Sequence, residues 1–509
     1  RMALEFKVIK ASRYIKVLPY TERARTMCLR FQSKFIHRNY NKNNQGQDQK
    51  IYACGLYDNS EFRFHRNTFA SFQNHVKEHL IYENEYEIEE KAFPFIVKRT
   101  IAVKKHITPR ADQEPIIDYL VAQEPKDKFL GAQTGFGKTV CSLIAISRLG
   151  YRTVIIVEGG LLPKWASDIL KILDIPSKRT LCVRGSAQLK GLIGMGKTKE
   201  FDNIDIILMS STTLQDWITT HETLAHEKDI DIGYGIHPEE FYEHLGIGHR
   251  LIDEVHKKFH FNFKQDLYTN THSVTSLSAT LFSYDKVLEG FYEIAYPKLQ
   301  RFNGGEVIKY TRSYAVLYRL GKGRKVKTKE YGRSEYSHNA FENSVMKNHY
   351  FKENYFEMIA ETLDIGYIKN YKEGNKAAIY VSSTDLATEL VKYLKKRFPG
   401  KSVERYCSSL KDPYRNLLDP DIRVSTLGSG GTGHDIPQLT DTILTISIMS
   451  LQANVQVFGR TRFLPDQDTR FYFFNCRDVD KHMEYYHLKA KLMQDRAKTY
   501  DVLNYDIEM

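Results

Sequence analysis

Runs of apolar, β-branched residues alternate with segments of helical spacing along most of the chain. The first set of runs lies at 153–157 (TVIIV), 204–210 (IDIILMS) and 249–253 (HRLID). A second set lies at 376–383, 422–426, 441–448 and 469–475. Continuous apolar runs separated by helices are typical of strands buried in parallel sheets. Two successive sets predict an α/β fold with two tandem, doubly wound parallel-sheet domains.

The first hundred residues have a different pattern and predict a small α+β accessory domain. Its expected elements are short strands at 5–10 (EFKVIK) and 61–65 (EFRFH), a polar loop or hairpin tip at 37–50, and a helix within 67–85. The acidic stretch at 82–93 is expected to lead to the domain boundary.

These patterns divide the chain into four parts. They are the accessory domain at 1–100, the first sheet domain at 101–312, the second at 313–485, and a charged C-terminal helical tail at 486–509. A basic, glycine-containing segment at 319–339 separates the two sets of strands. It is either a solvated linker or a strand or hairpin that contacts nucleic acid, with Lys325 and Lys327 as the candidate contacts.

Charge and composition narrow the classes of protein. The 509 residues carry a net charge of +12 and include 33 tyrosines and 28 phenylalanines. Such a chain is compatible with a polyanionic partner, because cations neutralise phosphates and aromatic faces stack on bases. A merely basic surface gives the same composition, so the charge alone leaves nucleic acid as one of two interpretations.

Cysteine spacing and the length of the apolar runs indicate the cellular compartment. The six cysteines are scattered without a C-x-x-C pair, which argues against a zinc site or a disulfide framework and fits a reducing cytosol. No apolar run approaches the roughly 18–20 residues that a membrane span needs, and the first residues lack the apolar core of a secretion signal. We therefore expect a cytoplasmic protein with no membrane partner.

The segment FLGAQTGFGKTVCSLIAI, residues 129–146, carries the strongest single motif. A strand runs into a glycine-bearing loop and then into a helix, so backbone amides and the helix N-terminus can face a phosphate. Lys138 would neutralise the β- and γ-phosphates of ATP, and the Thr139 hydroxyl would hold Mg²⁺. The loop residues expected to contact the nucleotide are Thr134, Gly135, Gly137, Lys138 and Thr139.

The segment LIDEVHKKF supplies a second half of the site. A strand ends in Asp253 and Glu254, which places two carboxylates at the carboxyl edge of the sheet, where open α/β sheets bind ligands. Asp253 would hold the Mg²⁺ shell, and Glu254 would orient and deprotonate the attacking water.

Upstream of the phosphate loop, Arg110 and Gln113 precede an amphipathic helix. A glutamine amide can pair with both the donor and the acceptor on an adenine edge. Its place about 20 residues before a phosphate loop favours adenine recognition over an ordinary surface position.

In order and spacing, these and further motifs resemble those of the superfamily 2 helicases and translocases. The matching segments are AQTGFGKT, VIIVEGGLLPKW, MSSTTLQ, DEVH, SLSAT, AAIYVSSTDLATELVKYL, VSTLGSGGTGHDIPQL and QVFGRTRF. The likeness covers residues 105–475. The small β-rich N-terminal domain and the long spacing between Thr426 and Gly433 are most similar to the phage UvsW-type branch-migration helicases, which are RecG-like in activity.

The resemblance implies two tandem RecA-like domains, with ATP and Mg²⁺ bound at the motifs. Ser278 and Thr280 of SLSAT would link the nucleotide to the nucleic acid, although strand-end hydroxyls also satisfy local backbone. Asp435 would hold the ribose or the catalytic arginine, or serve as a turn residue, and Gly433 would allow close backbone approach. Candidate nucleic-acid contacts are Ser211, Thr212, Ser382, Ser383, Thr426 and Trp165, the last being either a base-stacking or a core tryptophan.

The arginines of VQVFGRTRF would complete the ATP site. The family pattern Q-x-x-G-R-x-x-R puts its second arginine seven residues after the glutamine. Counted from Gln456, that position is Phe463, and Arg462 comes one residue early, whereas Arg460 keeps its expected place. Either arginine is therefore the candidate for the γ-phosphate, and Arg462 could instead pair with a surface carboxylate such as Asp466.

Taken together, the motifs predict an ATP-dependent DNA helicase or translocase that remodels branched DNA in phage replication, recombination or repair. The expected partners are branched or forked DNA and an R-loop RNA–DNA hybrid, with the protein acting as a monomer on DNA. The alternatives are a double-stranded DNA translocase without strand separation, an RNA helicase, a nucleic-acid-binding scaffold with a degenerate ATPase, and an ATPase that acts on proteins or metabolites.

Overall fold

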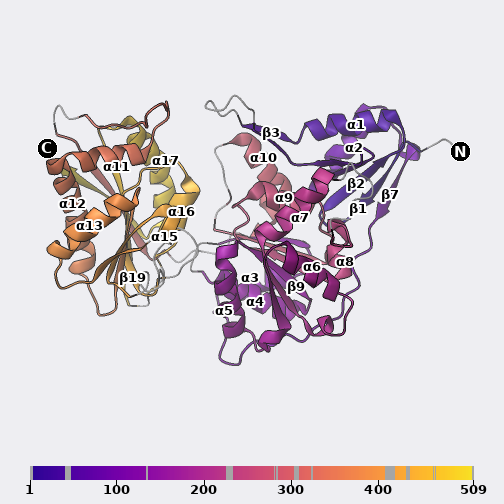
Figure 1. The fold of residues 1–509 in the computed structure, drawn as a ribbon, viewed down its shortest axis with the longest axis horizontal. Coiled ribbons are helices and arrows are strands. Elements are labelled where there is room, and N and C mark those ends of the chain that lie inside the picture. The colour runs from indigo at the N-terminus through magenta and orange to yellow at the C-terminus, as the bar shows by residue number, and fades with distance from the viewer. Residues whose placement is uncertain are drawn as a thin grey trace. The chain divides into compact units, whose positions relative to one another are not determined.

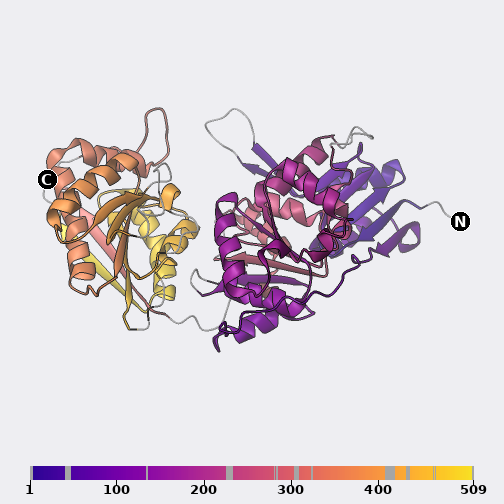
Figure 2. The same ribbon diagram turned by 60° about the horizontal axis from the view of Figure 1, so that its bottom comes forward.

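The computed structural model describes residues 4–39, 48–132, 136–224, 233–279, 281, 285–302, 309–321, 325–406, 419–430, 436–461, 464 and 466–506. The chain divides into two compact units: the first comprises 1–132 and 137–305, and the second comprises 306–509 together with 133–136. Each unit is built around a parallel sheet with helices on its faces (Figures 1 and 2).

The sheet of the first unit has seven parallel strands. In spatial order they are β10 (Thr180–Val183), β11 (Ile206–Ser210), β9 (Thr153–Val157), β12 (His249–Ile252), β13 (Ser273–Ser278), β8 (Asp127–Gly131) and β14 (Arg301–Phe302). The helices of this region are α3 (Glu114–Val121), α4 (Lys138–Leu149), α5 (Leu162–Ile172), α6 (Ser186–Met195), α7 (Ser211–Leu224), α8 (Phe241–His244), α9 (Phe259–Asp266) and α10 (Lys286–Ala295). Strand β9 is buried over its whole length, as its unbroken run of apolar residues predicts.

The second unit contains another seven-stranded parallel sheet. Its strands are, in spatial order, β17 (Val403–Tyr406), β18 (Ile422–Thr426), β16 (Lys376–Val381), β19 (Leu439–Leu444), β20 (Thr469–Cys476), β15 (Thr311–Arg319) and β21 (Thr499–Asp506). Its helices are α11 (His338–Lys347), α12 (His349–Leu363), α13 (Thr384–Arg397), α15 (Leu427–Gly430), α16 (Leu451–Phe458) and α17 (Asp480–Arg496), with a π-helical turn at Asp364–Ile368. The predicted fold class, two tandem RecA-like domains, is confirmed.

Two details of the predicted organisation are wrong. The basic segment 319–339 does not connect the sheets, because β15 precedes it and already belongs to the second sheet. Within its described residues 325–337 there is no strand, and Val326 packs against the core of the second unit. The expected helical tail at 486–509 is also only partly helical, since α17 ends at Arg496 and β21 then pairs in parallel with β15.

The N-terminal residues form the predicted α+β domain within the first unit. Its sheet has the order β5 (Cys54–Leu56), β6 (Glu61–His65), β2 (Tyr14–Pro19), β1 (Phe6–Lys10) and β7 (Tyr86–Glu90), and its helices are α1 (Glu22–Ser33) and α2 (Phe69–Glu78). Strands β3 (Ile36–Asn39) and β4 (Asp48–Ile51) pair as an antiparallel ribbon at the predicted polar hairpin. The acidic boundary segment contains an unexpected strand, β7, which pairs in parallel with β1.

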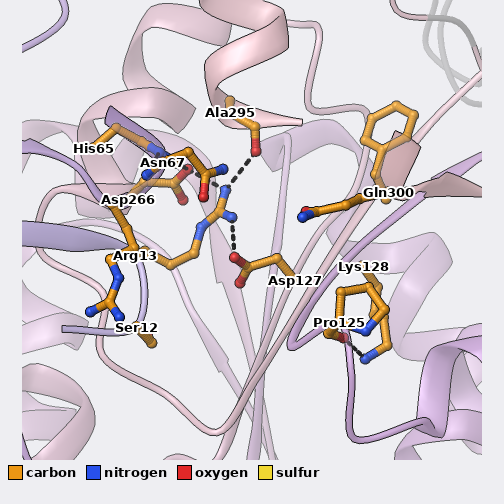
Figure 3. Close-up of polar contacts among 12 residues, drawn as sticks. Ser12, Arg13, His65, Asn67, Pro125, Asp127, Lys128, Asp266, Ala295 and Gln300 are labelled. Carbon is orange, nitrogen blue, oxygen red and sulfur yellow. Dashed lines mark hydrogen bonds and ion pairs between the residues drawn. The ribbon is translucent and has the colours of Figure 1, made fainter. Parts of the chain in front are cut away.

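A buried ion cluster fastens this domain to the first parallel-sheet domain. Figure 3 shows the Arg13 guanidinium between Asp266 and Asp127, at distances of 2.6 Å and 2.8 Å. The other oxygen of Asp266 lies 2.5 Å from Arg250, and His65 Nε2 lies 3.0 Å from the carboxylate. Burial alone would raise the pKa of Asp266, but the charges of Arg13 and Arg250 outweigh it and hold the pKa far below its ordinary value.

Aromatic side chains also pack between the N-terminal domain and the first sheet domain. The Tyr52 ring stacks on Phe291 of α10 with a centroid separation of 3.9 Å, and Phe263 of α9 meets it edge-on at 5.0 Å. The accessory domain and the first sheet domain therefore share one core. In the part of the chain that the structure describes, no helix is both long and apolar enough to cross a membrane.

Candidate nucleotide and nucleic-acid sites

The phosphate loop leads from β8 to α4, as the motif predicts. Gly137 precedes the helix with φ of +95°, a left-handed conformation that favours glycine. A Cβ at Gly137 would collide with Nε2 of Gln113, so the side chain expected to recognise adenine lies directly against this loop. Lys138 Nζ donates to the Ala132 carbonyl at 2.9 Å. Thr134 and Gly135 lie outside the described residues.

Gln113 is almost completely buried, just before the first residue of α3. Its Oε1 accepts a hydrogen bond of 3.0 Å from the Arg110 backbone N–H, which holds the amide toward the loop. The Arg110 side chain is exposed and donates from Nε and Nη2 to the two oxygens of Asp112, at 3.0 Å and 3.2 Å. The Gln113 amide thus lies beside the phosphate loop, whereas the Arg110 guanidinium has an acidic partner on the surface.

Asp253 directly follows β12 at the carboxyl edge of the sheet, where it is half-buried and makes three hydrogen bonds. Its backbone N–H donates to Ile156 of β9 at 3.1 Å. Its Oδ1 accepts from the Glu254 backbone N–H at 2.9 Å, and its Oδ2 accepts from Trp165 Nε1 at 3.0 Å. Burial and the neighbouring Glu254 raise the pKa of Asp253, while the Lys138 ammonium acts in the opposite direction.

Glu254 and His256 form the next part of this edge. Glu254 has φ of +53°, which is uncommon for a residue with a side chain and is concentrated at functional sites. His256 Nδ1 lies 2.7 Å from Ser278 Oγ at the end of β13. Burial, followed by the charges of Lys257 and Lys138, lowers the pKa of His256 to about 3, so the imidazole is neutral near pH 7. Its 3.3 Å contact with Glu254 Oε2 is therefore not an ion pair.

The SLSAT motif is tied to the nucleotide motifs through this imidazole. The Ser278 carbonyl also accepts a hydrogen bond of 3.2 Å from the Ala132 N–H, at the start of the phosphate loop. Ser278 therefore contacts both the DEVH segment and the start of the phosphate loop, and its coupling role stays a prediction. Thr280 lies outside the described residues.

The donor set suits an Mg²⁺ ion that arrives with a nucleotide. Mg²⁺ is usually held by one or two carboxylates together with substrate phosphates, and it keeps several waters. The described residues contain no cluster of three or more metal-binding side chains, so no all-protein cage is present among them. Asp253 supplies a half-buried carboxylate, and Thr139 lies in the first turn of α4. Glu254 Oε2 is buried without a hydrogen-bond partner among the described residues, so it remains available to a water.

Of the two interpretations of Trp165, base stacking or core packing, its burial agrees with the second. It has no exposed surface on α5, and its indole N–H is bonded to Asp253. Ser211 and Thr212 begin α7, directly after β11. Thr212 is exposed and its hydroxyl lies 2.8 Å from Ser210 Oγ, while Ser211 Oγ is buried with no hydrogen-bond partner within the described ranges.

In the second unit the candidate contacts gather at the carboxyl edge of the central strands. Ser382 directly follows β16, and Thr426 ends β18 in register with Val381. Ser383 Oγ accepts from the Leu386 N–H at 3.2 Å and so caps α13. In the basic segment, Lys325 and Lys327 are exposed.

Glu342, which lies outside every predicted motif, connects three segments at this edge. Glu342 of α11 is fully buried, and its Oε2 accepts from the Ser382 backbone N–H at 2.8 Å. Its Oε1 accepts from Tyr355 at 2.8 Å and from Thr445, the residue after β19, at 2.6 Å. His338 Nε2 lies 3.3 Å away. One carboxylate thus joins the loop after β16 to the segment that leads into the arginine motif.

The arginine motif lies in the turn after α16. Arg460 is buried, with 8% of its surface exposed, and its backbone N–H donates to Val457 at 3.1 Å. The next residue, Thr461, is anchored to Thr311 of β15 by a hydroxyl contact of 2.9 Å. Arg462, Gly433 and Asp435 lie outside the described residues, so the predicted choice between the two arginines stays open.

Comparison with known proteins gives only distant likenesses. No family model matches the sequence, and no curated protein matches it. A structure of Mss116p bound to ssRNA and AMP-PNP is 16% identical over 78% of this chain and 74% of its own, with a TM-score of 0.49. The helicase domain of Pyrococcus furiosus Hef is 14% identical over 75% and 98%, with a TM-score of 0.44. The structure of T4 UvsW is 11% identical over 99% and 100%, with a TM-score of 0.35. All three scores lie below 0.5, and the roles proposed below depend on the residues of this chain alone.

Proposed function

We propose that the protein is an ATP-dependent nucleic-acid motor that remodels branched DNA. The observation that carries the proposal is the meeting of three motifs at one edge of the first sheet. Gln113 lies against Gly137 of the phosphate loop, and Ser278 contacts both His256 of the DEVH segment and Ala132 at the start of the loop. Open α/β sheets bind their ligands at this edge. The chain also contains a second seven-stranded parallel sheet.

In this proposal each residue has a role in phosphoryl transfer. Gln113 recognises the adenine edge, and Lys138 leaves the Ala132 carbonyl to neutralise the β- and γ-phosphates. Glu254, whose buried Oε2 has no hydrogen-bond partner among the described residues, orients the attacking water and accepts its proton. Mg²⁺, held by Asp253 and Thr139, would neutralise charge on the phosphate oxygens.

The second unit contributes nucleic-acid contacts and an arginine. Ser382, Ser383 and Thr426 are proposed to donate to backbone phosphates, a kind of contact that follows a strand without recognising its sequence. Arg460 or Arg462 is proposed to stabilise the charge that develops on the γ-phosphate. The net charge of +12 supports a polyanionic partner.

The first test is ATP turnover by the purified chain with and without nucleic acid. We expect DNA to stimulate turnover, and Lys138→Ala to abolish it while leaving DNA binding largely intact. Turnover that no nucleic acid changes would refute the motor and favour an ATPase that acts on proteins or metabolites. Stimulation by RNA but not by DNA would indicate an RNA helicase.

Substrate choice is tested with synthetic forks, four-way junctions and R-loops. ATP-dependent conversion of these substrates supports branch migration and R-loop unwinding. Displacement of a triplex-forming strand without conversion of any of them would indicate a double-stranded DNA translocase that does not separate strands.

A further inference from the structure

The indole of Trp165 lies beside a carboxylate of the candidate nucleotide site. It is completely buried, and its Nε1 donates to Oδ2 of Asp253 at 3.0 Å. The second oxygen, Oδ1, accepts from the backbone N–H of Glu254 at 2.9 Å. Each carboxylate oxygen of Asp253 therefore has one fixed donor, and the two donors come from different segments.

Two hydrogen-bond partners of Asp253 come from elsewhere in the sheet domain, and both belong to one β–α unit. The backbone N–H of Asp253 donates to Ile156 in β9, and Trp165 belongs to α5, the helix that follows β9. The backbone and the side chain of Asp253 thus both form hydrogen bonds with this β–α unit. Because two donors on two oxygens define the plane of a carboxylate, its rotation about the side-chain bonds is restricted.

The other tryptophan of the chain shows that burial alone does not demand this bond. Trp217 lies in the same unit, on α7, and only 1% of its surface is exposed. Its Nε1 has no hydrogen-bond partner among the described residues. Burial of an indole in this unit is thus not always accompanied by a hydrogen bond from the described residues, so the bond between Trp165 and Asp253 reflects the placement of the carboxylate.

We propose that Trp165 is a positioning residue that orients the Asp253 carboxylate for the Mg²⁺ ion carried by the nucleotide. The inference rests on the proposed function, because it assumes that Asp253 holds this ion. Each oxygen keeps a lone pair beyond its hydrogen bond, and the fixed donors determine where those lone pairs point. Donors that orient metal-binding carboxylates typically account for about 10–100-fold in metal affinity.

The experiment replaces Trp165 by Phe in the full chain, which keeps an aromatic ring and removes only the N–H donor and part of the ring system. Binding of a fluorescent ATP analogue is measured as Mg²⁺ is titrated. We expect Trp165→Phe to need about 10–100-fold more Mg²⁺ for half-maximal binding. Binding without Mg²⁺ should be unchanged. Trp217→Phe is the matched control and should follow the wild-type titration, because it removes an indole N–H that bonds nothing within the described residues.

The control variant also supplies a readout that leaves Trp165 intact. In Trp217→Phe the only remaining indole is Trp165, since the chain has two tryptophans. Its fluorescence should change when Mg²⁺ is added in the presence of ADP, whereas the fluorescence of Trp217 in Trp165→Phe should not. This measurement tests the proposal even if Trp165→Phe fails to fold.

Two results would overturn the inference. One is a Trp165→Phe chain that folds and has the wild-type Mg²⁺ titration. The other is Trp165 fluorescence that does not respond to Mg²⁺ in Trp217→Phe. In both cases wild-type nucleotide binding would still support the proposed ATPase. A wild-type chain that binds no ATP analogue at any Mg²⁺ concentration would refute the proposed function, and the inference with it.

Discussion

Substitution of Glu342 by Gln offers a test of how the second unit is held together. The carboxylate is fully buried and accepts hydrogen bonds from Ser382, Tyr355 and Thr445, which belong to three separate segments. Glutamine has nearly the same shape, but it has one acceptor oxygen where the carboxylate has two. Its NH₂ group would therefore face at least one donor, and a buried donor would be left unpaired.

The pKa of Glu342 determines how much the ionised carboxylate contributes to the free energy of unfolding. Burial alone would raise the pKa, but His338 and the hydrogen bonds of Ser382 and Thr445 outweigh it and lower the pKa from 4.5 to about 2. Each pKa unit corresponds to about 1.4 kcal/mol, so the ionised carboxylate contributes about 3 kcal/mol of stability at pH 7. Because the folded pKa is depressed, this contribution is complete above pH 4.5 and is lost as the pH falls toward about 2. At pH 3.5 about 2 kcal/mol should remain.

The two units can be followed separately in one unfolding experiment. Both tryptophans, Trp165 and Trp217, belong to the first unit, so tryptophan fluorescence reports that unit alone. Far-ultraviolet circular dichroism reports both units. In urea at pH 7, Glu342→Gln should lower the free energy of unfolding of the second unit by about 3 kcal/mol. The change should appear only in the part of the dichroism transition that has no counterpart in the fluorescence. Glu361→Gln, an exposed change on α12, is the matched control and should shift neither signal.

Two outcomes would refute this reasoning. A fluorescence transition that shifts as far as the dichroism transition would mean that Glu342 does not act on the second unit alone. A stability difference between wild type and Glu342→Gln that stays constant from pH 7 to pH 3.5 would mean that the ionised carboxylate is not the stabilising form.

Further predictions concern the nucleotide site. Glu254→Gln should bind ATP and hydrolyse it very slowly in a single-turnover assay, and near-normal turnover would remove Glu254 as the base. Arg460→Ala and Arg462→Ala should both bind ATP, and the variant that loses more turnover identifies the arginine that serves the γ-phosphate. Gly137→Ala should weaken ATP binding in equilibrium titrations, because its Cβ would displace Gln113 and the left-handed backbone costs about 1–2 kcal/mol for a residue with a side chain. Unchanged ATP affinity in Gly137→Ala would argue that Gln113 does not contact the adenine.

The central strands and the nucleotide motifs could be predicted because their signals are local. Strand β9 coincides with its apolar run, and β18 with the run at 422–426. Such runs have one stable solution, burial between two layers of helices. The phosphate loop was equally predictable, since Gly137 needs its left-handed backbone whatever surrounds it.

The edge strands could not be predicted in this way, because neighbouring strands stabilise them. Strand β7, sequence YEIEE, is mostly exposed and carries few apolar residues. Its glutamates Glu89 and Glu90 pair with Lys7 and Lys10 of β1, at 2.5 Å and 2.6 Å. Strand β21 is likewise mostly exposed, and its charged neighbours suggested a longer helix. Sequence periodicity contains no information about such cross-strand pairs until the sheet order is known.

The polar contacts at the sites were missed for a related reason. Trp165 and Asp253 are 88 residues apart in the chain, and the separation between Glu342 and Thr445 is 103. Each of these residues alone looks ordinary, as a core tryptophan or a helix glutamate. Only the fold shows that an indole N–H points at a carboxylate, or that a buried glutamate joins two strand ends.

Because of the ion cluster around Asp266, deletion of the N-terminal domain would also disturb the first sheet domain. Removing the first hundred residues would take Arg13 and His65 away from Asp266, and Tyr52 away from Phe291. A buried carboxylate that loses a partner typically destabilises its surroundings by about 3–5 kcal/mol. Loss of the proposed activity in such a truncated chain would therefore report damage to the first sheet domain, and point substitutions on the outer surface of the N-terminal domain are the way to test whether that domain recognises a substrate.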